Sequence, residues 1–180
     1  ESVKGNISLN NNNFRNSDKS IYGNIEAQET DRLKNFGYKT NKQGFSIGTG
    51  FEIFDDTRLG LGSSNYIEKI STNSNASARQ KKQAGNYFDS FINFNLDYDK
   101  RNQKFQTTDG FRSRYFLDLP LISDTNTLGN TYTYKYFTEL YEKNRSNISL
   151  YPKSANSITG DDIKLSERVF LPSNKLRGFE

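Results

Sequence analysis

Three carboxylates, Asp89, Asp97 and Asp99, have the spacing that would place them on one face of a β-strand. A face of this kind could bind a cation. Arg112 and Arg114 alternate in the same way in the next predicted strand, so charge-assisted pairs between the two strands are favoured over a metal site.

The residue types that are missing narrow the chemistry further. The chain of 180 residues has no Cys and no His, which excludes thiol nucleophiles, disulfides, imidazole bases and the usual zinc ligands. The net charge of +4 is too small to indicate a nucleic-acid partner. We therefore expect no enzyme, no catalytic residue, no metal and no cofactor.

The arrangement of apolar residues predicts an all-β fold. Only 32% of the residues are hydrophobic while 14% are aromatic, so a regular pattern is needed to offset the entropy lost on folding. Apolar and polar residues alternate in runs near 3–9, 21–28, 44–53, 58–62, 88–99, 111–119, 132–140 and 148–150. Each run would form a strand with one apolar and one polar face, and the turns between the runs favour an antiparallel meander of about eight strands.

Run length and loop pattern favour a membrane barrel over a soluble sandwich. Several runs reach about 10–13 residues, and tilted strands of about 9–11 residues cross a bilayer. Short connections at 55–57 and 143–147 alternate with long ones at 31–42, at 71–86 and after Pro152, as in outer-membrane barrels. In a barrel the apolar face would meet lipid, whereas in a sandwich it would pack on a second sheet.

The chain also reads as a piece of a larger barrel. A translated chain begins with Met, so we expect Glu1 to follow a processing or excision point. Residues 1–180 would form a single partial barrel domain in which 153–180 is a long loop.

Two motifs lie at predicted strand ends. Asp99 and Arg101 close one strand, and Thr108-Asp109-Gly110 opens the next; alone, they indicate a polar hairpin connection. The run Ser166–Phe170, followed by Arg177-Gly178-Phe179, would alone indicate a surface loop. Their occurrence together, in this order, is much more specific.

The pair of motifs resembles the BamA family of outer-membrane protein assembly factors, within the superfamily of bacterial surface-antigen barrels. In that family a strand ending Asp-x-Arg leads through a turn ending Pro-Thr-x-Gly into the next strand. A later extracellular loop carries Arg-Gly-Phe or Arg-Gly-Tyr. Thr107 stands where the family usually has Pro, and Pro172-Ser173 replaces a usual Gly-Gly. The resemblance covers almost the whole chain.

This resemblance implies a fold, a location and partners. The chain would supply about eight strands, roughly the fourth to the eleventh, of a sixteen-stranded transmembrane barrel in the outer membrane of a Gram-negative bacterium. The first and last strands and the periplasmic repeats would be missing, and 153–180 would be an extracellular loop. The whole protein would insert unfolded outer-membrane proteins by pairing them onto an opened barrel edge, with outer-membrane lipids and assembly-machinery lipoproteins as further partners.

The resemblance also implies a functional residue, Arg177. Its guanidinium would hold the loop in the lumen by bidentate pairing with carboxylates, Gly178 would allow a tight backbone, and Phe179 would pack the tip. Without the resemblance, an exposed Arg in a mobile loop is the better interpretation. Two alternatives remain open: a sister barrel that translocates or assembles a restricted set of clients, and a soluble all-β binding module that uses its Tyr-rich strands.

Overall fold

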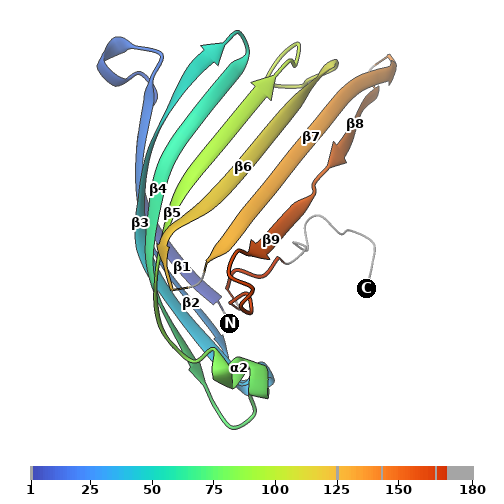
Figure 1. The fold of residues 1–180 in the computed structure, drawn as a ribbon. Coiled ribbons are helices and arrows are strands. Elements are labelled where there is room, and N and C mark those ends of the chain that lie inside the picture. Colours follow the sequence, from blue (N-terminus) through green and yellow to red (C-terminus); the bar gives the residue numbers. More distant parts are fainter. Residues whose placement is uncertain (1, 125, 143, 165, 170–180) are drawn as a thin grey trace.

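The computed structural model describes residues 2–124, 126–142, 144–164 and 166–169, and shows one antiparallel sheet that curves into a trough (Figure 1). The strands are β1 (Ser2–Asn11), β2 (Ser20–Arg32), β3 (Tyr38–Phe54), β4 (Thr57–Thr72), β5 (Gly85–Asp99), β6 (Gly110–Ser123), β7 (Thr127–Tyr141), β8 (Asn144–Leu150) and β9 (Lys153–Ser157). The short helices are η1 (Phe14–Asn16), α1 (Leu33–Phe36) and α2 (Ala78–Lys82). Within these residues no helix is long and apolar enough to cross a membrane.

The sheet is a meander in which each strand pairs with the next along the chain. β8 and β9 both pair with β7, with Leu150 opposite Tyr134 and Lys153 opposite Thr131. They are two halves of one long strand that is interrupted at Pro152, which has no N–H to donate to the ladder. The prediction of an all-β antiparallel meander is confirmed, and over the described residues the sheet is not closed into a ring.

The loops predicted over 31–42 and 153–180 were too long because the strands continue through polar sequence. The turn predicted over 143–147 is also shorter, since β8 begins at Asn144. The loop expected over 31–42 is reduced to 33–37, since β2 and β3 extend to meet there and are braced by an ion pair between Glu29 and Lys39 at 2.8 Å. The loop expected over 153–180 begins only after Ser157, because Lys153–Ser157 pairs with Thr127–Thr131. In both places backbone pairing, which needs no apolar side chain, extends the strand.

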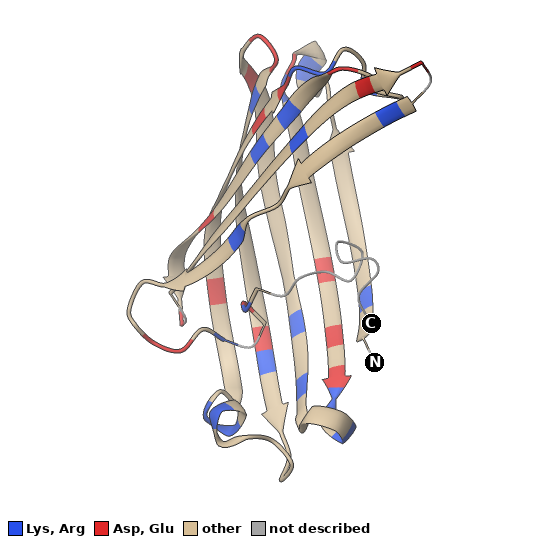
Figure 2. Cartoon of the chain, turned by 90° about the vertical axis from the view of Figure 1, so that its right-hand side faces the viewer, with Lys and Arg blue, Asp and Glu red and all other residues tan. Residues whose placement is uncertain are grey.

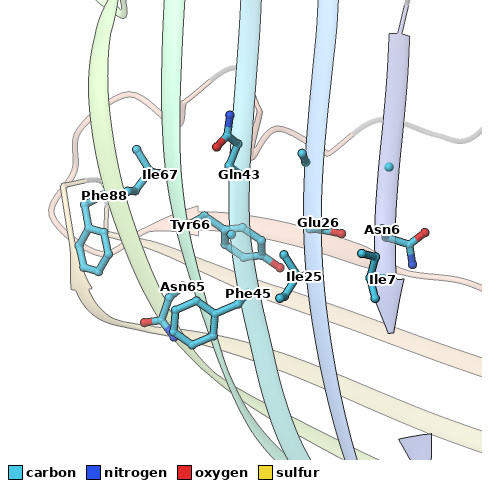
Figure 3. Close-up of a pocket in the computed structure, with 13 residues that line it drawn as sticks. Asn6, Ile7, Ile25, Glu26, Gln43, Phe45, Asn65, Tyr66, Ile67 and Phe88 are labelled. Carbon is cyan, nitrogen blue, oxygen red and sulfur yellow. The ribbon is translucent and has the colours of Figure 1, made fainter. Parts of the chain in front are cut away.

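One face of the sheet is apolar and uncovered. Ile25, Phe45 and Ile67 lie on neighbouring strands and are 64%, 50% and 64% exposed. With Ile7 and Phe88 they surround a shallow apolar groove of about 800 Å³ that crosses the first five strands (Figure 3). A soluble monomer rarely exposes so large a continuous apolar surface, so this face is suited to contact with hydrocarbon.

The opposite, concave face carries polar side chains, among them the buried Glu68 and Asp89 and the half-buried Asp97–Arg112 pair. Figure 2 shows that residues of both charge signs are spread over the strands. One aromatic side chain covers two of the glycines on this face. Tyr22 of β2 lies across Gly48 and Gly62, which face each other on β3 and β4. A Cβ at Gly48 would lie 2.5 Å from the Tyr22 ring, and one at Gly62 would lie 2.5 Å from its hydroxyl. An aromatic ring laid over strand glycines replaces packing that those glycines cannot supply.

This packing predicts that the effect of Gly48→Ala on stability depends on whether the Tyr22 ring is present. In the full-length protein, Gly48→Ala should lower the free energy of unfolding by about 1–3 kcal/mol, because the new methyl group displaces the Tyr22 ring. In a Tyr22→Ala background the same substitution should be neutral or stabilising, since alanine disfavours a strand less than glycine does. Urea unfolding of the four proteins of this cycle measures the coupling; equal effects of Gly48→Ala in both backgrounds would contradict it.

Candidate functional site

The connection between β5 and β6 is held by the first predicted motif. The guanidinium of Arg101 binds the Asp99 carboxylate through both oxygens, with Nε 2.7 Å from Oδ1 and Nη2 2.6 Å from Oδ2. Arg112, at the start of β6, pairs with Asp97 and lies 3.7 Å from Asp99. A bidentate pair of this kind fixes direction as well as charge, so it sets how the chain leaves β5.

Asn102 organises the rest of this turn, although sequence reasoning gave it no role. Its amide nitrogen donates to the Thr108 hydroxyl at 2.7 Å, and its side-chain oxygen accepts from the backbone N–H groups of Thr108 and Asp109, each at 3.3 Å. Its backbone N–H also donates to the Asp109 carbonyl at 3.1 Å. An Asn side chain that bonds nearby backbone is a usual stabiliser of turns.

Gly110 closes the turn and tolerates no side chain. Its φ of +98° lies in the region that disfavours other residues, and a Cβ there would lie 2.1 Å from the carbonyl oxygen of Lys100. Thr107, which stands in place of the expected Pro, is buried and donates its hydroxyl to the Gln103 carbonyl at 2.7 Å. The structure thus joins Asp99, Arg101, Thr108, Asp109 and Gly110 in one brace between β5 and β6.

The three predicted carboxylates separate into two groups. Asp97 pairs with Arg112 on the neighbouring strand, as expected. Asp99 lies 3.7 Å from Arg112, but its bidentate partner is Arg101, two residues further along the chain in the turn. The expectation that Asp89 would lie near Arg112 and Arg114 was wrong, because Asp89 lies at the other end of β5, opposite Ser123, and contacts Lys164. Over the part of the chain that the structure describes, no cluster of His, Cys, Asp or Glu could hold a metal ion.

Residues 158–164 and 166–169, the described part of the segment 158–169, fold back onto the concave face and carry the second site. Lys164 is only 1% exposed, and its Nζ lies 3.1 Å from Glu68 Oε2, contacts the Asp89 carboxylate and lies 3.4 Å from Glu167 Oε1. Burial alone would lower the pKa of Lys164, but the hydrogen bond to Asp89 and the charges of Glu68 and Glu167 outweigh burial and raise that pKa above its ordinary value. The ammonium therefore stays protonated at neutral pH.

Contacts on both sides of Lys164 continue this docking. The Ser166 hydroxyl donates to Glu68 Oε2 at 2.7 Å, and Gln83 donates to the Ile163 carbonyl at 3.3 Å. Nearer the start of the segment, Arg79 of α2 binds Asp162 with Nε 2.8 Å from Oδ2. This hydrogen bond holds the pKa of Asp162 below its usual range. The strand wall, the α2 loop and the returning segment thus form one polar assembly. We call this assembly, centred on Lys164, Glu68 and Asp89, the lysine anchor.

Sequence reasoning missed the lysine anchor and placed the functional residues further along. Arg177, Gly178 and Phe179 lie outside the described residues, as does Phe170 of the preceding run. Of that run, Ser166 and Glu167 lie at the anchor, and Arg168 Nε donates to the Ile163 carbonyl at 3.1 Å. No local signal marks Lys164, because its partners lie on strands far away in sequence.

Comparison with known proteins agrees with this architecture. Residues 1–180 match the Omp85 superfamily domain. No curated protein sequence matches the chain. Among solved structures, BamA from Haemophilus ducreyi lacking POTRA domains 1–3 superposes with a TM-score of 0.74 at 18% identity, over 92% of this chain and 35% of that one. At that identity the likeness concerns the fold, and this chain spans about a third of the length of that protein.

Proposed function

The chain belongs to the Omp85 superfamily, and we propose on this basis that it forms part of the barrel of a factor that inserts or assembles proteins in the bacterial outer membrane. The observation that carries the proposal is the two-faced sheet. Its uncovered apolar face suits lipid, and its polar concave face receives a returning segment through the lysine anchor. The barrel would act without covalent chemistry.

The physical problem for such a factor is the backbone of its clients. An unpaired N–H or C=O group in hydrocarbon costs several kcal/mol, so a strand cannot enter a membrane alone. A barrel edge that offers its own unpaired groups removes that cost by β-augmentation. The partners that follow are unfolded outer-membrane proteins, the surrounding lipids and the lipoproteins of an assembly machinery.

A second function in the same class differs in the range of clients. A sister barrel that translocates or assembles a few dedicated proteins would need the same two-faced sheet. A soluble binding module is disfavoured, because Ile7, Leu9 and Phe45 are 73%, 78% and 50% exposed on the apolar face. Such a surface would cause association in water.

Depletion of the full-length protein in its own host separates these functions. For a general assembly factor, the folded amounts of several unrelated outer-membrane barrels should fall together, measured on unheated gels where folded barrels migrate faster. A fall confined to one secreted or inserted client would favour the sister barrel. Unchanged levels of every client would contradict both.

Within this proposal Arg177 remains the functional residue of the loop tip. Complementing the depleted strain with Arg177→Ala should lower client assembly roughly tenfold, the effect of losing a charge-assisted pair. Lys175→Ala, two residues away, is the matched control and should assemble clients normally. Unchanged client insertion together with unchanged heat-modifiability of the Arg177→Ala barrel would show that Arg177 is not a functional residue.

A further inference from the structure

The lysine anchor places a charge where charges are rarely found. Lys164, Glu68 and Asp89 are each 1% exposed, and such residues are seldom buried unless they are paired. Glu68 comes from β4 and Asp89 from β5, so one ammonium joins two strands of the wall to the returning segment. The Tyr87 ring also contacts the ammonium, with its centroid 4.9 Å from Lys164 Nζ.

The carboxylates of the wall depend on this ammonium. Glu68 Oε2 is bound by Lys164 and by Ser166, while Glu68 Oε1 is buried and has no hydrogen-bond partner within the described chain. The Asp89 carboxylate accepts hydrogen bonds from the Lys164 ammonium and from the Ser123 hydroxyl. Removing one partner of a buried ion pair leaves the other charge uncompensated, which is far more destabilising than losing an exposed pair.

A second charged contact of the segment, between Arg79 of α2 and Asp162, is exposed to solvent. The Arg79 and Asp162 side chains are 59% and 58% exposed, and pairs at that exposure contribute little because water screens them. The docking of 158–169 therefore rests on Lys164 much more than on Arg79, although both residues are cationic.

We propose that Lys164 is a positioning residue whose ammonium fixes the segment 158–169 to the inner wall of β4 and β5. Eight peptide units separate Val169 from Arg177, so a fixed segment keeps the Arg177 backbone within about 28 Å of Val169, and the free loop is shortened accordingly. The consequence for assembly rests on the proposed function, whereas the docking itself does not.

Trypsin reports the docking directly in the full-length protein in detergent. Cleavage of the Arg168–Val169 bond requires the segment to leave the wall and extend in the protease, and Arg168 is present in every variant below. Lys164→Met keeps the length of the side chain but removes the charge, and should speed this cleavage by at least about 100-fold. Client assembly in the depleted strain, measured in parallel, should fall with it.

Three variants separate the charge from other effects. Lys34→Met makes the same exchange at an exposed residue of α1 and should change cleavage by no more than about twofold. Arg79→Gln removes the exposed pair and should change it by less than about fivefold. The triple variant Lys164→Met, Glu68→Gln, Asp89→Asn removes the uncompensated carboxylates, and should cleave at least about tenfold more slowly than Lys164→Met alone.

If the Lys164→Met barrel does not fold, Ser166→Ala gives a milder test, because it removes only the hydroxyl that donates to Glu68. It should speed cleavage about fivefold.

Wild-type cleavage rates in both Lys164→Met and Ser166→Ala would overturn the proposal, and so would a triple variant that cleaves as fast as the single one. Faster cleavage with wild-type assembly would overturn the link between docking and assembly. If the unaltered protein assembles no client, the proposed function is refuted. The cleavage rates would still test whether Lys164 holds the segment to the wall.

Discussion

Replacing Gly110 with alanine is expected to lower the free energy of unfolding of the barrel by at least about 2 kcal/mol, through strain at a positive φ together with a direct clash. At a φ of +98° the new Cβ would lie 2.1 Å from the Lys100 carbonyl oxygen and 3.0 Å from Arg101 Cα. Both neighbours are backbone, so neither can swing aside. Relief requires the strand to slide, which breaks the bond from the Lys100 N–H to the Phe111 carbonyl at 2.9 Å.

Urea unfolding of the full-length protein, followed by the gel shift of the folded barrel, measures this loss. Gly23→Ala is the matched control, because a Cβ at Gly23 has nothing within 4 Å, and it should be neutral or slightly stabilising. Equal midpoints for Gly110→Ala and the unaltered protein would show that the turn does not hold the geometry described here.

Replacing Ile47 with lysine is expected to have the other large effect, a loss of about 2–4 kcal/mol in a bilayer. Ile47 lies near the middle of β3 on the apolar face and is 56% exposed. If that face meets lipid, the ammonium must enter hydrocarbon or distort the bilayer. Folding into vesicles of defined lipid, titrated with urea, gives the difference in free energy.

Ser46 is the control because it precedes Ile47 on the same strand and points to the concave face, opposite Asn24 and Ser64. Ser46→Lys should cost less than about 1 kcal/mol, since lumen-facing substitutions do not enter lipid. A loss for Ser46→Lys as large as that for Ile47→Lys would contradict the assignment of the two faces.

Alternation in the sequence predicted which residues share a face, but not how far the strands run. The apolar runs correctly placed Phe45 and Ile47 opposite to Ser46 and Gly48, because side-chain direction in a strand depends on parity alone. The ends of β2 and β3 were missed because they carry pairs such as Glu29 and Lys39, which stabilise a strand without any hydrophobic signal. β9 was missed because Lys153–Ser157, after the break at Pro152, has no alternation of apolar and polar residues.

The two parts of the candidate site differ in how local they are. The β5–β6 brace joins residues of one short stretch, Asp99 to Gly110, so a motif marks it, although the organising role of Asn102 was not predicted. The lysine anchor joins residues 75 positions apart in Lys164 and Asp89, and 98 apart in Ser166 and Glu68. Such a contact depends on the path of the returning chain, which a periodic pattern does not specify.

The central claim is that lipid covers one face of the sheet and water the other, and β5 tests it most directly. Single cysteines at residues 91–96 of the full-length protein, each carrying a fluorophore, are reconstituted in vesicles that contain a lipid-bound nitroxide quencher. Labels at Ile92, Phe94 and Leu96 should be quenched, and labels at Phe91, Asn93 and Asn95 should not, although Phe91 is itself apolar. Uniform quenching along the strand, or none at any position, would contradict the account.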